Sequence, residues 1–185
     1  GLSLNDCYWV VDESFRDTFE HYNLYDNRFN RVLSLIAYTG YGDTIQSDFT
    51  STPELTTGGI LAKCWRRIGG KIVLYKAGST GAANAGYEPY SEFYAYQIAN
   101  TMGLKAVEYH LHYWKGRLCS TCELFTTKTQ SYIPTGRIVT DGGWVAVLQY
   151  YKECGDRYYE TLVDMLIFDA VICNEDRHFG NFGLM

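Results

Sequence analysis

A glycine pair, Gly69-Gly70, separates two runs of strand-forming residues and constrains the fold more strongly than any other short feature. One run occupies 59–67 and the other 71–76, and a Gly-Gly pair between two such runs is typical of a β-hairpin. Two further runs of this kind, over 107–114 and 117–125, are joined by a Lys-Gly pair. We therefore expect two antiparallel strand pairs within one β-rich half of the chain.

Helical segments surround and follow this β-rich half. The spacing of apolar residues predicts a helix over 29–36, and a proline in the first turn marks the start of a second helix over 89–102. After a polar stretch over 126–143, two more helices are predicted over 144–151 and 158–173. The last of these is apolar almost all round, so we expect it to be buried. This order of elements predicts an α+β fold.

Composition limits the range of functions. The 185 residues are 46% hydrophobic and leave room for one domain or two small lobes. A formal net charge of −5 argues against broad electrostatic binding to nucleic acid or to anionic membranes. No apolar run is of transmembrane length and no signal peptide opens the chain, so we expect a cytoplasmic protein. Cys119 and Cys122 form a CxxC pair without a second pair, which favours free thiols over a zinc site.

The polar loop over 174–181 carries the strongest functional pattern. It follows an apolar helix, and its residues Asp176 and Asn181 are five positions apart. Protein kinases use this interval in their catalytic loop, where the Asp accepts the proton of the substrate hydroxyl and the Asn binds Mg²⁺. The alternative is a polar loop in which Asn174 caps the helix and Asp176 pairs with Arg177. The full pattern Asn-x-Asp-Arg-His-x-x-Asn favours the catalytic interpretation.

A glycine loop and a cation for nucleotide phosphates are predicted upstream, because kinase chemistry needs both. Gly58-Gly59 offers backbone N–H groups, and Lys63 follows closely. Lys76 ends an apolar run, and Glu92 on the following helix is its expected partner, with Glu88 as the second choice. The alternatives are an exposed lysine at a strand end and a glutamate that complements the helix dipole.

Two further segments leave alternatives open. The glycine-rich segment 78–86 forms either a second anion-binding nest or a flexible connector. The segment from Glu123 to Phe125 either donates and accepts backbone hydrogen bonds to adenine, as a kinase hinge does, or simply ends a strand. The chain contains no Gly-x4-Gly-Lys-Ser/Thr motif, which disfavours a P-loop NTPase.

Together these residues resemble the HipA family of bacterial serine/threonine kinases, over about 56–185 and most strongly over 174–183. The resemblance implies a protein-kinase-like fold that binds ATP and Mg²⁺ and transfers the γ-phosphate to a Ser or Thr of a protein substrate. It implies Asp176 as the catalytic base and Asn181 as a Mg²⁺ ligand. Family members often act as toxins with a DNA-binding antitoxin partner. The nucleotide contacts that the resemblance implies come from Gly58, Gly59, Lys63, Lys76 with its partner Glu92, Glu123, Phe125 and His178.

The resemblance also sets out an organisation for the chain. It comprises an N-terminal extension of unknown role over 1–55, a nucleotide-binding small lobe over 56–126, and the start of a large lobe over 127–185. We expect Asp176 and Asn181 to face the same cleft as Lys76. The family carries a second metal-binding Asp in strands after the catalytic loop, whereas only four residues follow Asn181 here. We therefore expect these 185 residues to be inactive by themselves; the alternative is a non-catalytic pseudokinase or phage-type interaction module.

Overall fold

The computed structural model forms two compact units, Gly1–Thr129 and Gln130–Met185. The first unit contains an antiparallel sheet and helices, and the second contains helices and a two-stranded pairing, so the predicted α+β class is confirmed. The residues that the structure describes are 11–29, 34–35, 38–39, 61–80 and 85–185. Parts of three predictions lie outside them: most of the 29–36 helix, the glycines Gly58 and Gly59, and the centre of the 78–86 segment.

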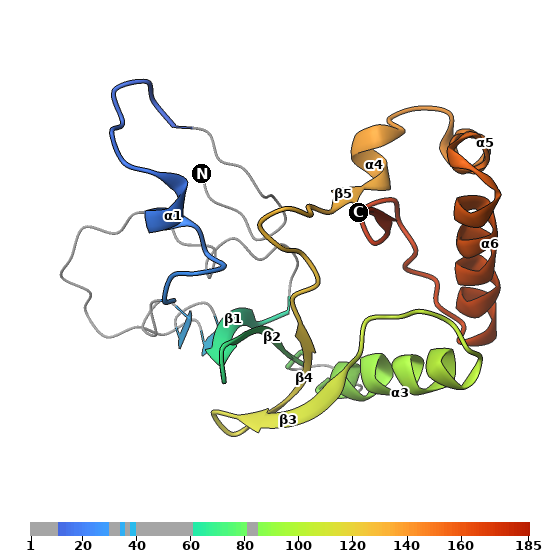
Figure 1. The fold of residues 1–185 in the computed structure, drawn as a ribbon. Coiled ribbons are helices and arrows are strands. Elements are labelled where there is room, and N and C mark those ends of the chain that lie inside the picture. Colours follow the sequence, from blue (N-terminus) through green and yellow to red (C-terminus); the bar gives the residue numbers. More distant parts are fainter. Residues whose placement is uncertain (1–10, 30–33, 36–37, 40–60, 81–84) are drawn as a thin grey trace. The chain divides into compact units, whose positions relative to one another are not determined.

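The sheet of the first unit contains four strands in the order β1-β2-β4-β3, all antiparallel to their neighbours (Figure 1). Their bounds are β1 Lys63–Ile68, β2 Lys71–Ala77, β3 His110–Trp114 and β4 Arg117–Glu123. The predicted hairpin is confirmed, because Gly69 and Gly70 link β1 to β2 with φ angles of 56° and 86°. Two positive φ values in a two-residue loop match the twist of antiparallel strands and favour glycine at both positions.

The two faces of this sheet have different coverings. Successive side chains of a strand point to opposite faces, so even-numbered and odd-numbered residues of β2 separate. The helix α3 (Glu88–Thr101) contacts the even face, where its residue Glu92 reaches Lys76 and Ser120. The odd face carries a core made by Tyr38, Cys64, Tyr75, Ala77 and Cys119.

The strand β4 carries the CxxC pair. Because Cys122 is the third residue after Cys119 on the same strand, their side chains lie on opposite faces of the sheet. Both are buried free thiols, as predicted. Across the described residues, no cluster of three or more His, Cys, Asp and Glu side chains is placed to bind a metal ion.

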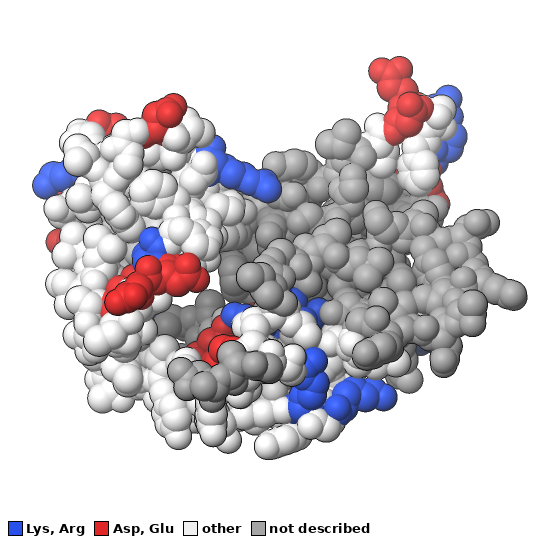
Figure 2. Space-filling model, turned by 180° about the vertical axis from the view of Figure 1, so that it is seen from behind, with Lys and Arg blue, Asp and Glu red and all other residues white. Residues whose placement is uncertain are grey.

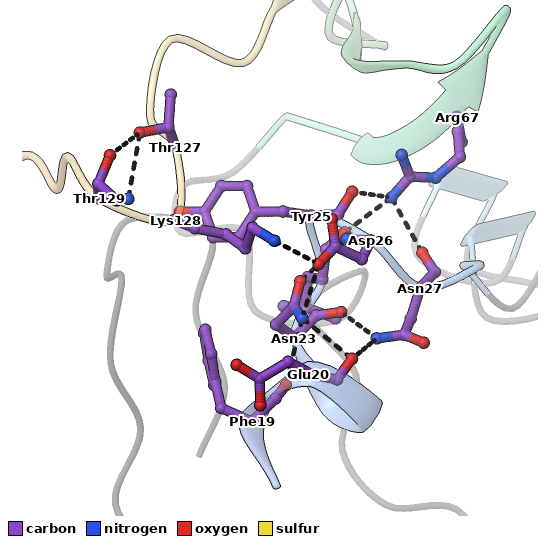
Figure 3. A network of polar contacts seen from close by, with 11 residues as sticks. Phe19, Glu20, Asn23, Tyr25, Asp26, Asn27, Arg67, Thr127, Lys128 and Thr129 are labelled. Atoms are coloured by element: carbon purple, nitrogen blue, oxygen red, sulfur yellow. Dashed lines mark hydrogen bonds and ion pairs between the residues drawn. The ribbon is translucent and has the colours of Figure 1, made fainter.

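A polar network joins the N-terminal segment to the sheet edge and to the residues after β4 (Figure 3). This segment includes the short helix α1 (Phe19–Tyr22). The Arg67 guanidinium donates to the carbonyl oxygens of Leu24, Tyr25 and Asn27 at 2.8–2.9 Å. Asp26 accepts hydrogen bonds from Asn23 at 3.1 Å and from Lys128 at 2.7 Å. Residues far apart in the sequence therefore hold the first unit together.

The second unit is built around two helices that follow one another in the chain, α5 (Gly143–Cys154) and α6 (Asp156–Val171). Val147, Tyr151, Leu162 and Phe182 form its buried core. The polar stretch before α5 contains the strand β5 (Ile133–Pro134) and the helix α4 (Thr135–Ile138), and β5 pairs with β6 (Gly183–Leu184).

The expected burial of the last helix is wrong. Ile167 and Val171 of α6 are 53% and 56% exposed, because α6 packs against α5 along only one side. No helix within the described part of the chain has the length and apolar character needed to cross a bilayer.

Candidate functional site

An ion pair between Lys76 and Glu92 forms the centre of the first cluster. Lys76 lies on β2 and Glu92 lies one turn into α3, so the strand and the helix are joined at this point. The two side chains are 25% and 21% exposed, respectively. Ser120 of β4 is the register partner of Lys76 and donates its hydroxyl to the other carboxylate oxygen of Glu92. The structure therefore forms the predicted Lys–Glu pair and adds a serine to it.

Lys63 belongs to the same cluster. It is the direct cross-strand partner of Lys76 in the β1–β2 register. Burial lowers the pKa of Lys63, the nearby charge of Lys76 lowers it further, and Glu92 opposes both effects. Two lysines and one carboxylate thus lie together among the described residues of the even face. Sequence reasoning named these three residues but missed Ser120, whose position depends on the β2–β4 register.

A buried thiol lies next to this cluster. Burial raises the pKa of the Cys122 thiol to about 11, against a hydrogen bond from Tyr109 that lowers it. The charge of Glu92 raises this pKa too, which shows that Cys122 lies close to the carboxylate. The thiol is therefore a neutral, apolar neighbour of the Lys76–Glu92 pair.

Glu88 does not contact Lys76 and has a different role. One oxygen of its carboxylate accepts hydrogen bonds from the backbone N–H groups of Ser79 and Gly86, both at 3.1 Å. Gly78 is required here, because a Cβ at this position would lie 2.5 Å from the Cα of Gly86. The carboxylate thus fixes the two ends of the glycine-rich segment together.

The predicted hinge lies at the end of β4. The side chain of Glu123 pairs with Lys71 on the odd face, opposite to Lys76, so the Glu123 carboxylate cannot join the cluster on the even face. A cavity of about 540 Å³ on that odd face is lined by Lys71, His110, Glu123 and Phe125 among others. The N–H of Leu124 donates to the carbonyl oxygen of Ile72 at 2.8 Å, and the hinge role of the segment from Glu123 to Phe125 stays a prediction.

The loop over 174–181 begins with a tight helix end. The N–H of Asn174 donates to the carbonyl of Asp169 at 2.8 Å, and the N–H of Cys173 donates to Ala170 at 3.4 Å. This pair of bonds is a Schellman motif, in which the residue after the cap adopts a left-handed conformation. Cys173 has that conformation, with φ of 54°, although glycine is usual there. The turn folds the loop back onto the end of α6.

Hydrogen bonds inside the loop hold the predicted catalytic residues. The side-chain amide of Asn181 donates to the carbonyl oxygen of Asp176 at 2.7 Å, which leaves its own side-chain oxygen for a cation. The N–H of Asp176 donates to the side-chain oxygen of Asn174 at 3.2 Å. The ring Nδ1 of His178 accepts from the N–H of Gly180 at 3.1 Å, so His178 shapes the turn. The side chains of Asp176, His178 and Asn181 are exposed.

Arg177 pairs with Asp169 and not with its neighbour Asp176, so the sequence-based alternative of an Asp176–Arg177 pair is wrong. Nε and one terminal nitrogen of the guanidinium lie 2.6 and 2.7 Å from the two carboxylate oxygens. Burial alone would raise the pKa of Asp169, but Arg177 and Asn174 outweigh it, and the pKa lies below its usual value. Sequence reasoning missed this role, although an Asp within the apolar end of α6 was a visible signal.

The loop fits a magnesium ion in donor type. Asp176 and Asn181 offer carboxylate and amide oxygens, which Mg²⁺ prefers, and this ion usually takes only one or two protein ligands beside water and phosphate oxygens. Lys76 belongs to the first unit and Asp176 to the second. The expected common cleft therefore stays a prediction.

Charged side chains on the face shown in Figure 2 form small separate groups, with no continuous basic area among the described residues visible there.

Compared with protein-family models, with curated proteins and with solved structures, the chain matches none of them.

Proposed function

We propose that this chain provides the nucleotide-binding and catalytic-loop parts of an ATP-dependent phosphotransferase of the HipA-like kinase type, which transfers the γ-phosphate of ATP to a Ser or Thr of a protein. The observation that carries the proposal is the ion pair between Lys76 of β2 and Glu92 of α3. A strand lysine that pairs with a helix glutamate and binds nucleotide phosphate is a recurring part of kinase sites.

The sheet supports this role for Lys76. The helix α3 lies between β2 and β3 in the chain, and β4 lies between the same two strands in the sheet. This order places Ser120 beside Lys76 and lets one carboxylate fix both. Lys63 lies directly across the strand pair from Lys76, so a second lysine stands beside the proposed phosphate-binding cation.

The loop over 174–181 supports the second half of the proposal. Asp176 carries an exposed carboxylate for which no hydrogen-bond donor is seen in the described part of the chain, as a base that accepts a hydroxyl proton requires. Asn181 keeps its side-chain oxygen available because its nitrogen is bound to Asp176. A bound Mg²⁺ would neutralise phosphate charge there, and the protein's part is to hold these two oxygen groups in place.

ATP binding tests the proposal. We would titrate the protein with a fluorescent ATP analogue and Mg²⁺, and compare wild type with Lys76→Met and Lys71→Met. Loss of the phosphate-binding cation should weaken binding by about tenfold or more, the equivalent of a charge-assisted hydrogen bond of about 1.5–3 kcal/mol. Lys71 is the matched control, because it forms a Lys–Glu pair on the opposite face of the same sheet.

Equal losses in the two variants, or no binding by wild type, would contradict the proposal. Asp176→Asn provides a separate test of the chemistry. In a longer protein that continues through a second metal-binding Asp, it should leave ATP binding close to that of wild type and remove transfer of labelled phosphate to protein serine or threonine. Wild-type transfer that survives in Asp176→Asn would exclude this residue as the base.

A further inference from the structure

We propose that Asp169 is a positioning residue for the catalytic loop, acting through Arg177 and Asn174 to hold Asp176 and Asn181 in their orientation. The inference rests on the proposed function of Asp176 and Asn181. Asp169 touches neither of these side chains, and its own side chain is only 7% exposed, so it cannot reach a nucleotide or a substrate. Its contribution is therefore to the geometry of the loop.

The location of the Asp169 carboxylate is unfavourable unless hydrogen bonds to other groups compensate for its burial. Burial of a carboxylate costs several kcal/mol before compensation, on the order of what a buried ion pair can return. Asp169 also lies in the last turn of α6, where the helix dipole disfavours negative charge. Three hydrogen bonds offset both terms: two from Arg177, at 2.6 and 2.7 Å, and one from the side chain of Asn174 at 2.8 Å.

Asn174 passes this constraint to the catalytic base. Its side-chain nitrogen donates to Asp169, which fixes the direction of its side-chain oxygen. That oxygen accepts the N–H of Asp176. The carboxylate of Asp169 is thus connected to the backbone of the proposed base by a single amide group.

Arg177 constrains the loop from the other side. Its guanidinium is directed inward to Asp169 and its side chain is only 22% exposed. The two neighbouring side chains point in different directions: that of Asp176 is exposed to solvent, and that of Arg177 is half-buried. Asn181 then attaches to the carbonyl oxygen of Asp176. Release of Arg177 would free both Asp176 and Asn181 at once.

The test uses the whole 185-residue protein with three variants and a control. Asp169→Asn removes the charge, Arg177→Lys keeps a positive charge but loses the two-point contact, and the double variant removes both. If Asp169→Asn fails to fold, Arg177→Lys alone can test the inference. It keeps a cation beside the Asp169 carboxylate, so the buried charge is not left unpaired. The control is Asp164→Asn, an exposed carboxylate on the same helix.

Two readouts separate positioning from general stability. Without metal, NMR shifts of the Asp176 backbone amide and the Asn181 side-chain amide should change in Asp169→Asn and Arg177→Lys but not in Asp164→Asn. With Mn²⁺ and ATP, broadening of the Asn181 side-chain amide should require about tenfold more Mn²⁺ in Asp169→Asn, as for other groups that orient a metal ligand. The double variant should be no worse than the more affected single variant, because both act through one contact.

Wild-type shifts and wild-type Mn²⁺ dependence in a folded Asp169→Asn variant would overturn the inference. Additive losses in the double variant would also overturn it. If Mn²⁺ and ATP fail to broaden Asn181 in wild type, the proposed function fails instead, and the metal-free shifts still decide the role of Asp169.

Discussion

Replacement of Glu92 by Gln should destabilise the first unit by about 2 kcal/mol. A contact ion pair is worth about 4 kcal/mol at an effective dielectric constant of about 20, before the costs of desolvation and side-chain ordering. Removal of one partner of a fully buried pair costs about 3–5 kcal/mol, and Glu92 and Lys76 retain 21% and 25% of their exposure, which reduces this figure. The variant also leaves Lys63 and Lys76 as like charges in direct cross-strand register.

Replacement of Lys76 by Met should cost less, about 1 kcal/mol. Glu92 still accepts the hydrogen bond from the Ser120 hydroxyl. Lys63 also lies close enough for its charge to interact with the Glu92 carboxylate. The two variants are therefore unequal, although they remove the two halves of one ion pair. This asymmetry follows from a cluster of two cations and one anion.

Urea unfolding at neutral pH, followed by near-ultraviolet circular dichroism, would measure both values. The matched control is Glu123→Gln, which breaks the exposed pair with Lys71 on the other face of the sheet. Exposed pairs contribute about 0–1 kcal/mol, so this control should lose little stability. Equal losses in Glu92→Gln and Glu123→Gln, or a larger loss in Lys76→Met than in Glu92→Gln, would refute the reasoning.

Three other predictions concern the second unit and the thiols. Cys173→Gly should raise the unfolding free energy by about 1 kcal/mol, because glycine relieves the left-handed strain at φ 54°, and a loss measured by urea unfolding would contradict the assigned cap. The pKa of Asp169 is lowered from 3.8, so wild type should lose stability as pH falls from about 4 through that lower pKa. In Asp169→Asn the free energy of unfolding should fall less steeply over this acid range, and an unchanged slope would count against the ion pair of Asp169 with Arg177. In iodoacetamide labelling at about pH 8, mapped by mass spectrometry, exposed Cys173 should react well before buried Cys122, whose pKa is about 11, and equal rates would argue against the burial of Cys122.

Local patterns predicted the elements of the first unit well. The hairpin at Gly69-Gly70 and the helix that carries Glu92 both depend on residues close in sequence, and the structure contains both. The ion pair of Glu92 with Lys76 could be expected because a strand and the helix that follows it are neighbours in space. Ser120 could not be found in this way, since its position requires the register between β2 and β4.

The second unit shows what sequence patterns leave out. The strand β5 lies within a stretch that looks like a polar linker, and it exists because Pro134 pairs with Gly183 far along the chain. A Cβ at Gly183 would lie 2.0 Å from the carbonyl oxygen of Ile133, so this pairing requires glycine. The prediction that α6 is buried was wrong for a related reason. The apolar composition of a helix does not determine how many of its sides pack against other elements.

Arg177 gives the clearest example of an incorrect partner. A neighbouring Asp176 looks like its partner in sequence, whereas the helix end brings Asp169 beside it from eight positions away. The left-handed residue Cys173 makes this reversal, and nothing in the residue type cysteine predicts that conformation. The motif marks the loop as a candidate site, whereas the ion pair that supports the loop could not be predicted from the motif.

The network around Arg67 and Asp26 has a consequence for the order in which the chain folds on the ribosome. Arg67 binds carbonyls that precede it by 40–43 residues, whereas the contacts of Tyr25 with Thr126 and of Asp26 with Lys128 span 101 and 102 residues. At about 5–20 residues per second, synthesis of the longer interval takes about 5–20 s. The segment that carries Tyr25 and Asp26 is made before the sheet, yet all four strands must be synthesised before it can complete its contacts.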